Sequence, residues 1–371
     1  MRKVTYVLSG VEKAVAFEWI VACQKEIGAE LSFIFLNRNP NSPLQKFVEE
    51  RGVQNSFIQL KSKKDYPIVF LKLLKSLKEH KSDIVHCHLF DASFLGLMAS
   101  RLLGIKQRIY TRHHATYHHQ YFPKMVKYDQ FNNHNATHVV AISSNVKKVL
   151  LEQEGIDESK VKLIEHGFDL KAFNGVSASR IEKIRDKYQI PSNKFIVGCI
   201  SRYMKLKGID YIIEAYSSFI KEEPNAHLVL ANAKGPDEAW VKKELSKLPK
   251  ASYTEVLFEE DLFALYQQFN VFVHCPINEN IEAFGQTYVE ALASGIPSVF
   301  TLSGIAKDFI ENENNALVVE FKSHEGILSS LNRIKTDDAL RERLIRNGKQ
   351  SVKRFDLSEM VKNLTQLYLL N

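Results

Sequence analysis

The sequence predicts an α/β protein made of two doubly wound domains, and three observations carry this prediction. The chain has 371 residues, which is enough for two domains of ordinary size. Short apolar runs typical of buried strands alternate with segments that have helical spacing. This alternation begins twice, at residues 4–8 and again at residues 195–200. Each time a turn and a helical segment follow the apolar run, as at the start of a doubly wound fold.

Composition is that of a soluble globular chain, with 45% hydrophobic and 25% charged residues. No apolar run approaches the roughly 18 to 20 residues that span a bilayer. The first apolar run is too short for a secretory signal. The four cysteines have no CxxC spacing, which predicts free thiols in a reducing compartment: Cys23, Cys87, Cys199 and Cys275. We therefore expect a cytoplasmic protein.

The positive charge lies in the first half of the chain. Residues 1–172 hold 25 Lys and Arg against 17 Asp and Glu, a net +8, whereas the remainder holds 25 against 26, a net −1. This favours an anionic partner for the first half, such as a membrane surface or a phosphorylated acceptor; general solubility charge is the alternative. No repeated arginine and aromatic platform supports nucleic-acid binding, so we expect none.

In the first half, the strand at 4–8 ends at Ser9-Gly10 and a helical segment follows at 11–27. Apolar runs predict further strands at 31–36, 57–60, 83–87, 108–111, 138–142 and 161–164. Helical spacing predicts helices at 42–50, 67–79, 92–103 and 143–154, the last capped by Ser143-Ser144-Asn145.

The helix predicted at 67–79 alternates apolar residues with Lys72, Lys75 and Lys78, and four more lysines flank it between Lys61 and Lys81. A basic amphipathic helix of this kind can lie on an anionic membrane face. A surface helix docked on its own sheet is the alternative.

Residues 113–134 combine histidines with aromatic residues: His113, His114, His118, His119 and His134, with Tyr117, Tyr121, Phe122 and Tyr128. We favour a mobile, aromatic-rich acceptor-binding loop, because sugar rings stack on aromatic faces. Plain loop packing and a metal site are the alternatives. Against a metal, the cluster holds no carboxylate before Asp129, and the cysteines lie elsewhere.

The second half restarts the alternation after a linker predicted at 170–192, where Asn174-Gly175 and Pro191-Ser192 interrupt the pattern. Strands are predicted at 195–200, 227–231, 254–258, 271–273, 298–300 and 316–319. A helix that opens in the loop at 201–210 is predicted to end at residue 220. Further helices are predicted at 259–268, 325–334, 337–347 and 357–370.

The stretch 281–299 reads IEAFGQTYVEALASGIPSV. Glu282 would lie in the loop at a helix entrance, and Glu290 about one and a half turns into the helix. Gly285 leaves room for a ligand, and the free N–H groups of the first turn suit a phosphate. Such a site can hold sugar hydroxyls on one carboxylate and ribose hydroxyls on the other. A surface helix with two solvated glutamates is the alternative.

This stretch resembles the donor-site signature of retaining glycosyltransferases of family 4 (glycosyl transferases group 1). The shared pattern is Glu, seven residues, Glu, with Phe-Gly after the first and A-S-G-x-P-x-V after the second. The resemblance implies the GT-B fold, two doubly wound Rossmann-like domains facing across a cleft. It places an acceptor-binding domain at 1–172 and a donor-binding domain at 190–355. The C-terminal helix, 356–371, would pack back on the first domain.

Three more positions match the family pattern. Arg202 and Lys207, in a loop that ends at Gly208, match its diphosphate-binding pair, and fixed cations there stabilise the leaving diphosphate. Ser201 replaces the usual glycine. His113, with His114 as runner-up, matches a histidine that positions the donor sugar or acceptor.

The resemblance implies a metal-independent, retaining transfer from a UDP- or GDP-sugar to a hydroxyl of a glycan or glycolipid in bacterial surface polysaccharide synthesis. The enzyme would be cytoplasmic or peripheral on the inner membrane face. It would need no cofactor and no Asp-x-Asp metal-binding motif, because Arg202 and Lys207 would neutralise the leaving diphosphate in place of a metal ion. The implied catalytic residues are Glu282, His113, Lys207 and Arg202. The implied donor-binding residues are Arg202, Lys207, Glu282, Phe284, Gly285, Gln286, Glu290 and, more weakly, Gly10.

Three rival functions share these features. A GT-B epimerase would convert the nucleotide sugar without an acceptor, and a phosphorylase would need inorganic phosphate or a pyridoxal lysine. A non-catalytic scaffold would bind the nucleotide sugar only. The presence of Arg202, Lys207, Glu282 and Glu290 argues against the scaffold, because a scaffold does not need a leaving-group clamp.

Overall fold

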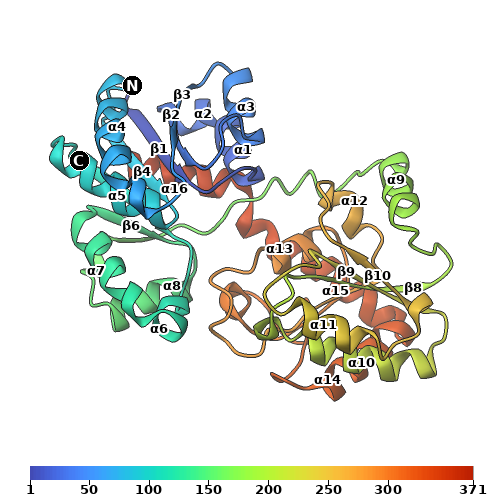
Figure 1. The fold of residues 1–371 in the computed structure, drawn as a ribbon. Coiled ribbons are helices and arrows are strands. Elements are labelled where there is room, and N and C mark those ends of the chain that lie inside the picture. The colour runs from blue at the N-terminus through green and yellow to red at the C-terminus, as the bar shows by residue number, and fades with distance from the viewer. Residues whose placement is uncertain (371) are drawn as a thin grey trace. The chain divides into compact units, whose positions relative to one another are not determined.

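The computed structural model describes residues 1–370 and divides into two compact units. The N-terminal unit comprises Met1–Phe168 and the C-terminal residues from Phe355 onward, and the C-terminal unit comprises Asp169–Arg354. Each unit is a parallel sheet covered by helices (Figure 1). The prediction of two doubly wound α/β domains is therefore confirmed.

The N-terminal unit contains a seven-stranded sheet in the order β3-β2-β1-β4-β5-β6-β7. All its neighbouring strands pair in parallel. Strand order reverses between β1 and β4, so ligands are expected outside the carboxyl ends of these strands. The strands are β1 (Lys3–Ser9), β2 (Glu30–Asn37), β3 (Gln54–Gln59), β4 (Ile84–His88), β5 (Gln107–Arg112), β6 (His138–Ala141) and β7 (Val161–Leu163).

Nine α-helices accompany this sheet within the described part of the unit: α1 (Val15–Ala22), α2 (Gln24–Ile27), α3 (Pro43–Glu50), α4 (Tyr66–Glu79), α5 (Phe90–Leu102), α6 (Tyr117–Tyr121), α7 (Val126–Asn135), α8 (Ser144–Lys148) and α16 (Leu357–Leu369). The helix predicted at 11–27 is interrupted at Cys23. Helix α8 continues as a π-helical turn, Val149–Gln153.

Helix α16 belongs to the N-terminal unit although it ends the chain (Figure 1). Its buried residues Val361, Leu364 and Tyr368 pack in the core with Val4 and Tyr6 of β1. The final residue of the helix predicted at 356–371 lies outside the described residues.

The C-terminal unit repeats the plan with six strands in the order β10-β9-β8-β11-β12-β13. The reversal here lies between β8 and β11. The strands are β8 (Phe195–Ile200), β9 (Ala226–Ala231), β10 (Tyr253–Val256), β11 (Val271–His274), β12 (Ser298–Phe300) and β13 (Leu317–Val318). The helices are α9 (Ala178–Tyr188), α10 (Ile209–Glu222), α11 (Glu238–Leu245), α12 (Leu262–Tyr266), α13 (Gln286–Ala293), α14 (His324–Thr336) and α15 (Asp338–Ser351).

The prediction of a loop at 113–134 is wrong, because this segment forms α6, a 3-10 turn at Pro123–Met125 and α7. The buried face of α7 is polar and consists of Asp129, Asn132, Asn133 and Asn135. An apolar periodicity, which is the main sequence signal for a helix, is therefore missing.

The predicted linker at 170–192 is also wrong in part, because it contains helix α9. Arg180 of α9 forms an ion pair of 2.6 Å with Asp261, and Gln268 donates to the Ile181 carbonyl at 2.9 Å. These contacts fix α9 beside α12 within the C-terminal unit.

All four cysteines are free thiols, and Cys87, Cys199 and Cys275 are buried. Among residues 1–370, no helix combines the length and the apolar character needed to cross a membrane.

Candidate active site

The carboxyl ends of β8 and β11 lie next to each other in the C-terminal sheet and carry the predicted donor site. The loop after β8 ends at Gly208, whose φ is +66°. A Cβ at this position would lie 2.1 Å from the Cys275 carbonyl oxygen, so only glycine allows the loop to approach the end of β11 so closely. This approach brings Lys207 to the loop that follows β11.

Lys207 and Glu282 form an ion pair between Nζ and Oε1. Both side chains are largely buried, with 19% and 12% exposed, respectively. Burial alone would raise the pKa of Glu282, but the Lys207 charge and a hydrogen bond from His274 lower it to about 2. Glu282 is thus a fixed, ionised carboxylate at neutral pH.

His274, the last residue of β11, is a third member of this group. Its Nε2 lies 3.0 Å from the same Oε1 atom of Glu282, and its side chain is only 3% exposed. Burial lowers the pKa of His274 against the opposing effect of Glu282. The neutral imidazole therefore donates its Nε2–H to the carboxylate.

The backbone around Glu282 is held by the segment after β12. The Glu282 N–H donates to Ser303 Oγ at 3.0 Å, and the Ile305 N–H donates to the Phe284 carbonyl at 2.9 Å. Gly304 has a φ of +58°, and a Cβ there would lie 2.7 Å from the Glu282 Cβ. The Glu282 loop is thus packed in place before any ligand binds.

Gly285 caps helix α13 in a left-handed conformation, with a φ of 89°. A Cβ at Gly285 would meet the Tyr288 ring at 2.6 Å, so the position requires glycine on two grounds. Gln286 follows as the exposed first residue of the helix. The helix N-terminus, with its partial positive charge, suits a phosphate or another anion.

Glu290 lies further along α13, where it accepts a hydrogen bond of 2.8 Å from the Tyr266 hydroxyl. Burial raises the pKa of Glu290 to about 7 against the lowering effect of that bond. The two carboxylates predicted for the site therefore differ: Glu282 is ion-paired, whereas Glu290 titrates near neutrality.

Arg202 lies in the same loop as Lys207 and is exposed. Within residues 1–370 its guanidinium makes no hydrogen bond or ion pair. The neighbouring Tyr203 anchors the loop, because it is fully buried and its hydroxyl donates to Glu255 at 2.8 Å. A fixed backbone thus presents a cation that an anionic ligand can bind.

Two predicted site residues, Gly10 and His113, lie in the N-terminal unit. Gly10 follows β1 with a φ of +65°, and its N–H donates to the Leu36 carbonyl at 3.1 Å. His113 follows β5 and lies 3.0 Å from His88, measured between Nε2 and Nδ1. Burial, followed by the neighbouring histidines, lowers the pKa of His113 to about 3. His113 is therefore a neutral hydrogen-bonding group.

His114, the alternative match to the family histidine, belongs to a different network of side chains centred on Asp129. Arg112, which is 2% exposed, pairs with Asp129 at 3.2 Å and with Glu154 at 2.5 Å. His118 Nδ1 lies 2.6 Å from Asp129, and His114 Nε2 lies 3.6 Å from it. The ligand atoms of His114, His118 and Asp129 are close enough to hold a cation. Arg112 already supplies a positive charge to Asp129, so we interpret the network as an anchor for α6 and α7.

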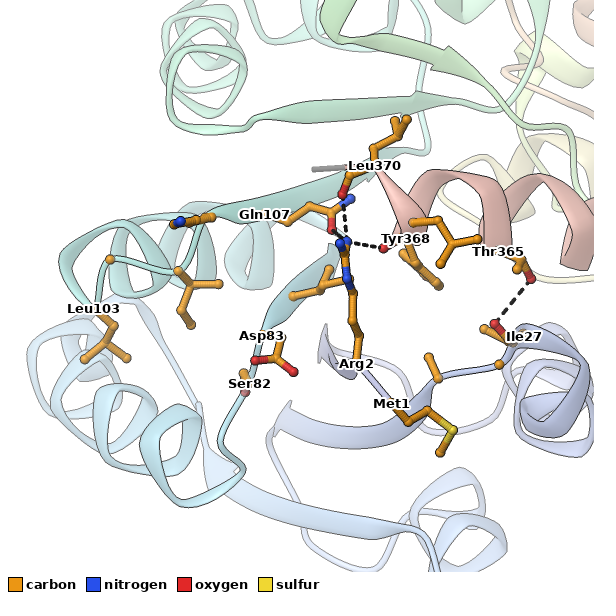
Figure 2. A pocket seen from close by; sticks show the side chains of 17 residues that line it. Met1, Arg2, Ile27, Ser82, Asp83, Leu103, Gln107, Thr365, Tyr368 and Leu370 are labelled. Atoms are coloured by element: carbon orange, nitrogen blue, oxygen red, sulfur yellow. Dashed lines mark hydrogen bonds between the residues drawn. The ribbon is translucent and has the colours of Figure 1, made fainter.

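A cavity of about 1000 Å³ lies elsewhere in the N-terminal unit, where β1, β4 and β5 begin. Figure 2 shows Arg2 reaching the end of α16, where Nη1 donates to the Tyr368 and Leu370 carbonyls at 2.6 and 2.7 Å. Ligands of parallel sheets bind outside the carboxyl ends of the strands. This cavity lies at the amino ends, so we do not assign the donor or acceptor to it.

Two histidines that contact the predicted site residues were not predicted, namely His274 and His88. Each is the last residue of a strand next to the reversal of strand order. A histidine at the end of an apolar run beside such a reversal is the signal that could have identified both.

Two models of known protein families match this sequence. The model for glycosyl transferases group 1 matches residues 180–351, and the model for glycosyltransferase family 4 matches residues 20–172. Alpha-monoglucosyldiacylglycerol synthase of Acholeplasma laidlawii is 25% identical over 84% of this chain and 82% of its own length. The capsular polysaccharide biosynthesis glycosyltransferase CapM of Staphylococcus aureus is 23% identical over 80% and 79%, respectively.

The fold is also that of solved glycosyltransferases. HepE of Anabaena, solved in complex with UDP and glucose, superposes with a TM-score of 0.82 at 18% identity, over 99% of this chain and 98% of its own. The two matched models together cover most of the sequence, so the chain belongs to the family 4 glycosyltransferases of GT-B fold. Its class of activity is glycosyl transfer.

Proposed function

We propose that the protein is a retaining glycosyltransferase that moves a sugar from a UDP- or GDP-sugar to a hydroxyl of a glycan or glycolipid. The observation that carries this proposal is the Lys207–Glu282 ion pair beside the exposed Arg202, at the carboxyl ends of β8 and β11. A site that cleaves a sugar–diphosphate bond needs fixed cations for the leaving group and acceptors for the sugar hydroxyls. These three residues supply both.

In this proposal the leaving diphosphate is bound by Arg202, Lys207 and the N-terminus of α13. Negative charge grows on the diphosphate as its bond to the sugar breaks, and cations fixed in advance stabilise that charge without reorganisation. Arginine suits the role because its planar fork matches two phosphate oxygens. Because these cations take the place of a divalent metal, the reaction would proceed without one.

The two carboxylates bind hydroxyl groups of the donor. Glu282 is held ionised by Lys207 and His274, so it accepts hydrogen bonds from hydroxyls of the transferred sugar. Phe284 and Gly285 would add backbone N–H contacts. Glu290 would accept from the ribose hydroxyls.

For the acceptor we propose a sugar or lipid-linked sugar that binds the N-terminal unit. The exposed rings of Tyr117, Tyr121 and Phe122 on and after α6 offer faces on which a sugar can stack. The Tyr117 ring centroid lies 5.5 Å from that of Tyr121 and 5.4 Å from that of Phe122. The curated relatives include a diacylglycerol glucoside synthase and a capsule enzyme, which supports a bacterial surface glycan or glycolipid as acceptor class.

We further propose that the segment Lys61–Lys81 meets an anionic membrane surface, which would make the enzyme peripheral on the inner face of the membrane. On α4 the apolar Ile68 and Leu71 are 54% and 62% exposed, beside exposed lysines at 72, 75 and 78. Apolar side chains flanked by lysines bind the interface of an anionic bilayer.

The membrane proposal is tested by co-sedimentation with liposomes that contain an anionic lipid. Leu71→Glu should weaken binding, whereas Leu257→Glu, at a position with a similar 60% exposure in the C-terminal unit, should not. Equal binding by wild type and Leu71→Glu would refute the assigned surface.

Transfer itself is tested with UDP- and GDP-sugars and a panel of lipid-linked and glycan acceptors. The proposal predicts a glycosylated product with the anomeric configuration of the donor, measured by NMR, and a rate that a chelator does not change. Conversion of the nucleotide sugar without an acceptor would instead indicate an epimerase. Nucleotide binding without any turnover would favour the scaffold function.

A further inference from the structure

His88 and His113 meet at the carboxyl edge of the N-terminal sheet. His88 is the last residue of β4, and His113 follows the neighbouring strand β5. Their ring nitrogens, His88 Nδ1 and His113 Nε2, lie 3.0 Å apart, and the ring centroids are 5.3 Å apart. One nitrogen must donate and the other must accept, so the bond couples the positions of two protons.

The surroundings of His88 decide which nitrogen donates. Its ring is stacked on Tyr6 at 5.5 Å and meets the edge of Phe17 at 4.9 Å, and only 6% of the residue is exposed. Its Nε2 atom is buried and has no hydrogen-bond partner in the described part of the chain. A proton on that atom would be an orphaned buried donor, which folded proteins avoid. The proton of a neutral His88 therefore lies on Nδ1.

This placement sets the tautomer of His113. The His88 Nδ1–H donates to His113 Nε2, so His113 must carry its own proton on Nδ1. The His113 ring makes no other hydrogen bond within residues 1–370. It can thus present an Nδ1–H donor to a ligand.

The backbone at this position adds a second observation. Leu89, directly after His88, has φ 70° and ψ 170°, a conformation that is almost restricted to glycine. Strain of this kind persists where the surrounding structure enforces it, and here it ends β4 at His88 and starts α5 at Phe90. His88 is therefore held in place by its ring contacts and by the turn that follows.

We propose that His88 is a positioning residue that fixes His113 in its Nδ1–H tautomer, so that His113 serves as a hydrogen-bond donor to an oxygen of the sugar donor or acceptor. The inference rests on the proposed function for the role of His113, but the tautomer itself does not.

The tautomer is tested first, by long-range ¹H–¹⁵N correlation NMR on protein labelled with ¹⁵N-histidine, with His113→Gln used to assign the His113 ring. The proposal predicts a protonated Nδ1 and an unprotonated Nε2 in His113. Protonation on Nε2 would overturn it, whatever the activity of the enzyme.

Kinetics then test the positioning role. His88→Leu removes the donor and should lower kcat/KM about three- to tenfold, the value of one neutral hydrogen bond. His88→Asn can place an N–H near the position of Nδ1 and should recover most of this loss. In a His113→Gln background, His88→Leu should have no further effect. An equal loss in both backgrounds, or wild-type turnover by a folded His88→Leu, would overturn the proposal.

Discussion

The two units of the molecule share one topology but carry opposite chemistry at corresponding edges. In the C-terminal unit, the edge beside the reversal of strand order is ionised, with Lys207 paired to Glu282. In the N-terminal unit, the same edge carries neutral imidazoles, because burial lowers the pKa of His113 to about 3. The ring of His166, which follows β7, stacks on that of His113 at 5.8 Å, and burial lowers its pKa to about 4. Under the proposed function, the fold determines where ligands bind, and the residues at each edge determine whether that ligand is an anion or a neutral hydroxyl.

The largest expected effect concerns the ionised edge. Lys207→Met should lower transfer by about 10² to 10³-fold, as measured for other fixed groups that stabilise developing negative charge. It also leaves Glu282 buried without its cation, which costs stability of about 3 kcal/mol or more. Both effects are measured by steady-state kinetics and urea unfolding.

A matched double variant separates these two effects. Lys207→Met combined with Glu282→Gln removes both charges and should regain much of the lost stability without regaining activity. Wild-type turnover by a folded Lys207→Met protein would remove Lys207 from the site.

Arg202 should have the next largest effect. Arg202→Ala removes the charge-assisted hydrogen bond that we propose to the donor diphosphate and should lower kcat/KM for the donor by about 10- to 100-fold. Little stability should be lost, because the side chain is exposed. Arg180→Ala is a suitable control, since this arginine pairs with Asp261 on the same unit and is not a predicted site residue. An equal effect of both changes would argue for a general charge effect.

A substitution at the neutral edge of the N-terminal unit should lower activity less than one at the ionised edge. His113→Gln keeps an amide donor and should lower kcat about three- to tenfold, because only a neutral hydrogen bond is changed. A loss as large as that of Lys207→Met would show that His113 acts on a charge and would end the contrast between the two edges.

The units should also differ in their response to acid. The pKa of buried His86 is lowered to about 3, whereas the unfolded chain takes up this proton below about pH 6.5. Stability is therefore lost as the pH falls from 6.5 toward 4, by about 2 kcal/mol at pH 5 for one such histidine. His113 and His166 act in the same direction.

In the C-terminal unit His227 and His274 act likewise, but Glu290 acts in the opposite direction. The pKa of Glu290 is raised to about 7, so the folded state binds a proton that the unfolded chain releases above about pH 4.5. The two tryptophans, Trp19 and Trp240, lie in different units. The Trp240→Phe protein keeps only Trp19 and so reports unfolding of the N-terminal unit, whereas the Trp19→Phe protein reports the C-terminal unit. Between pH 7.5 and pH 5, urea unfolding should show the larger loss of stability for the N-terminal unit. An equal loss in both units contradicts the comparison.

The smallest effect concerns Glu290. If Glu290 binds the ribose as a carboxylate, nucleotide affinity should fall as the pH drops through about 7, where this group becomes protonated. Glu290→Gln should bind more weakly at pH 8 and lose this pH dependence, which calorimetry would measure. An unchanged pH profile in Glu290→Gln would assign the dependence to another group.

Site residues that belong to one local sequence pattern could be predicted from the sequence. The spacing of Glu282, Gly285 and Glu290 places one carboxylate before a helix and one inside it, and the structure has this arrangement. Both sheets follow from apolar runs of strand length, as for β8, which begins and ends at the predicted residues.

The partners of residues that act through distant contacts could not be predicted. The bond from His274 to Glu282 depends on how the loop after β11 folds back, and the His88–His113 bond depends on strand pairing. Helix α7 was missed because its buried face is polar, and its residue Asp129 is held by Arg112 across the fold. The sequence shows such residues but not their partners.

The central claim, that the C-terminal unit binds a nucleoside diphosphate sugar through Arg202 and Lys207, is tested most directly by thermal denaturation with UDP, GDP and ADP. A ligand at about 100 times its Kd adds roughly 2.7 kcal/mol. For domains of this size that raises the midpoint by about 5 to 10 °C. The account predicts this shift with one nucleotide in the wild type and a much smaller one in Arg202→Ala. No shift with any nucleotide, or an equal shift in both proteins, would contradict it.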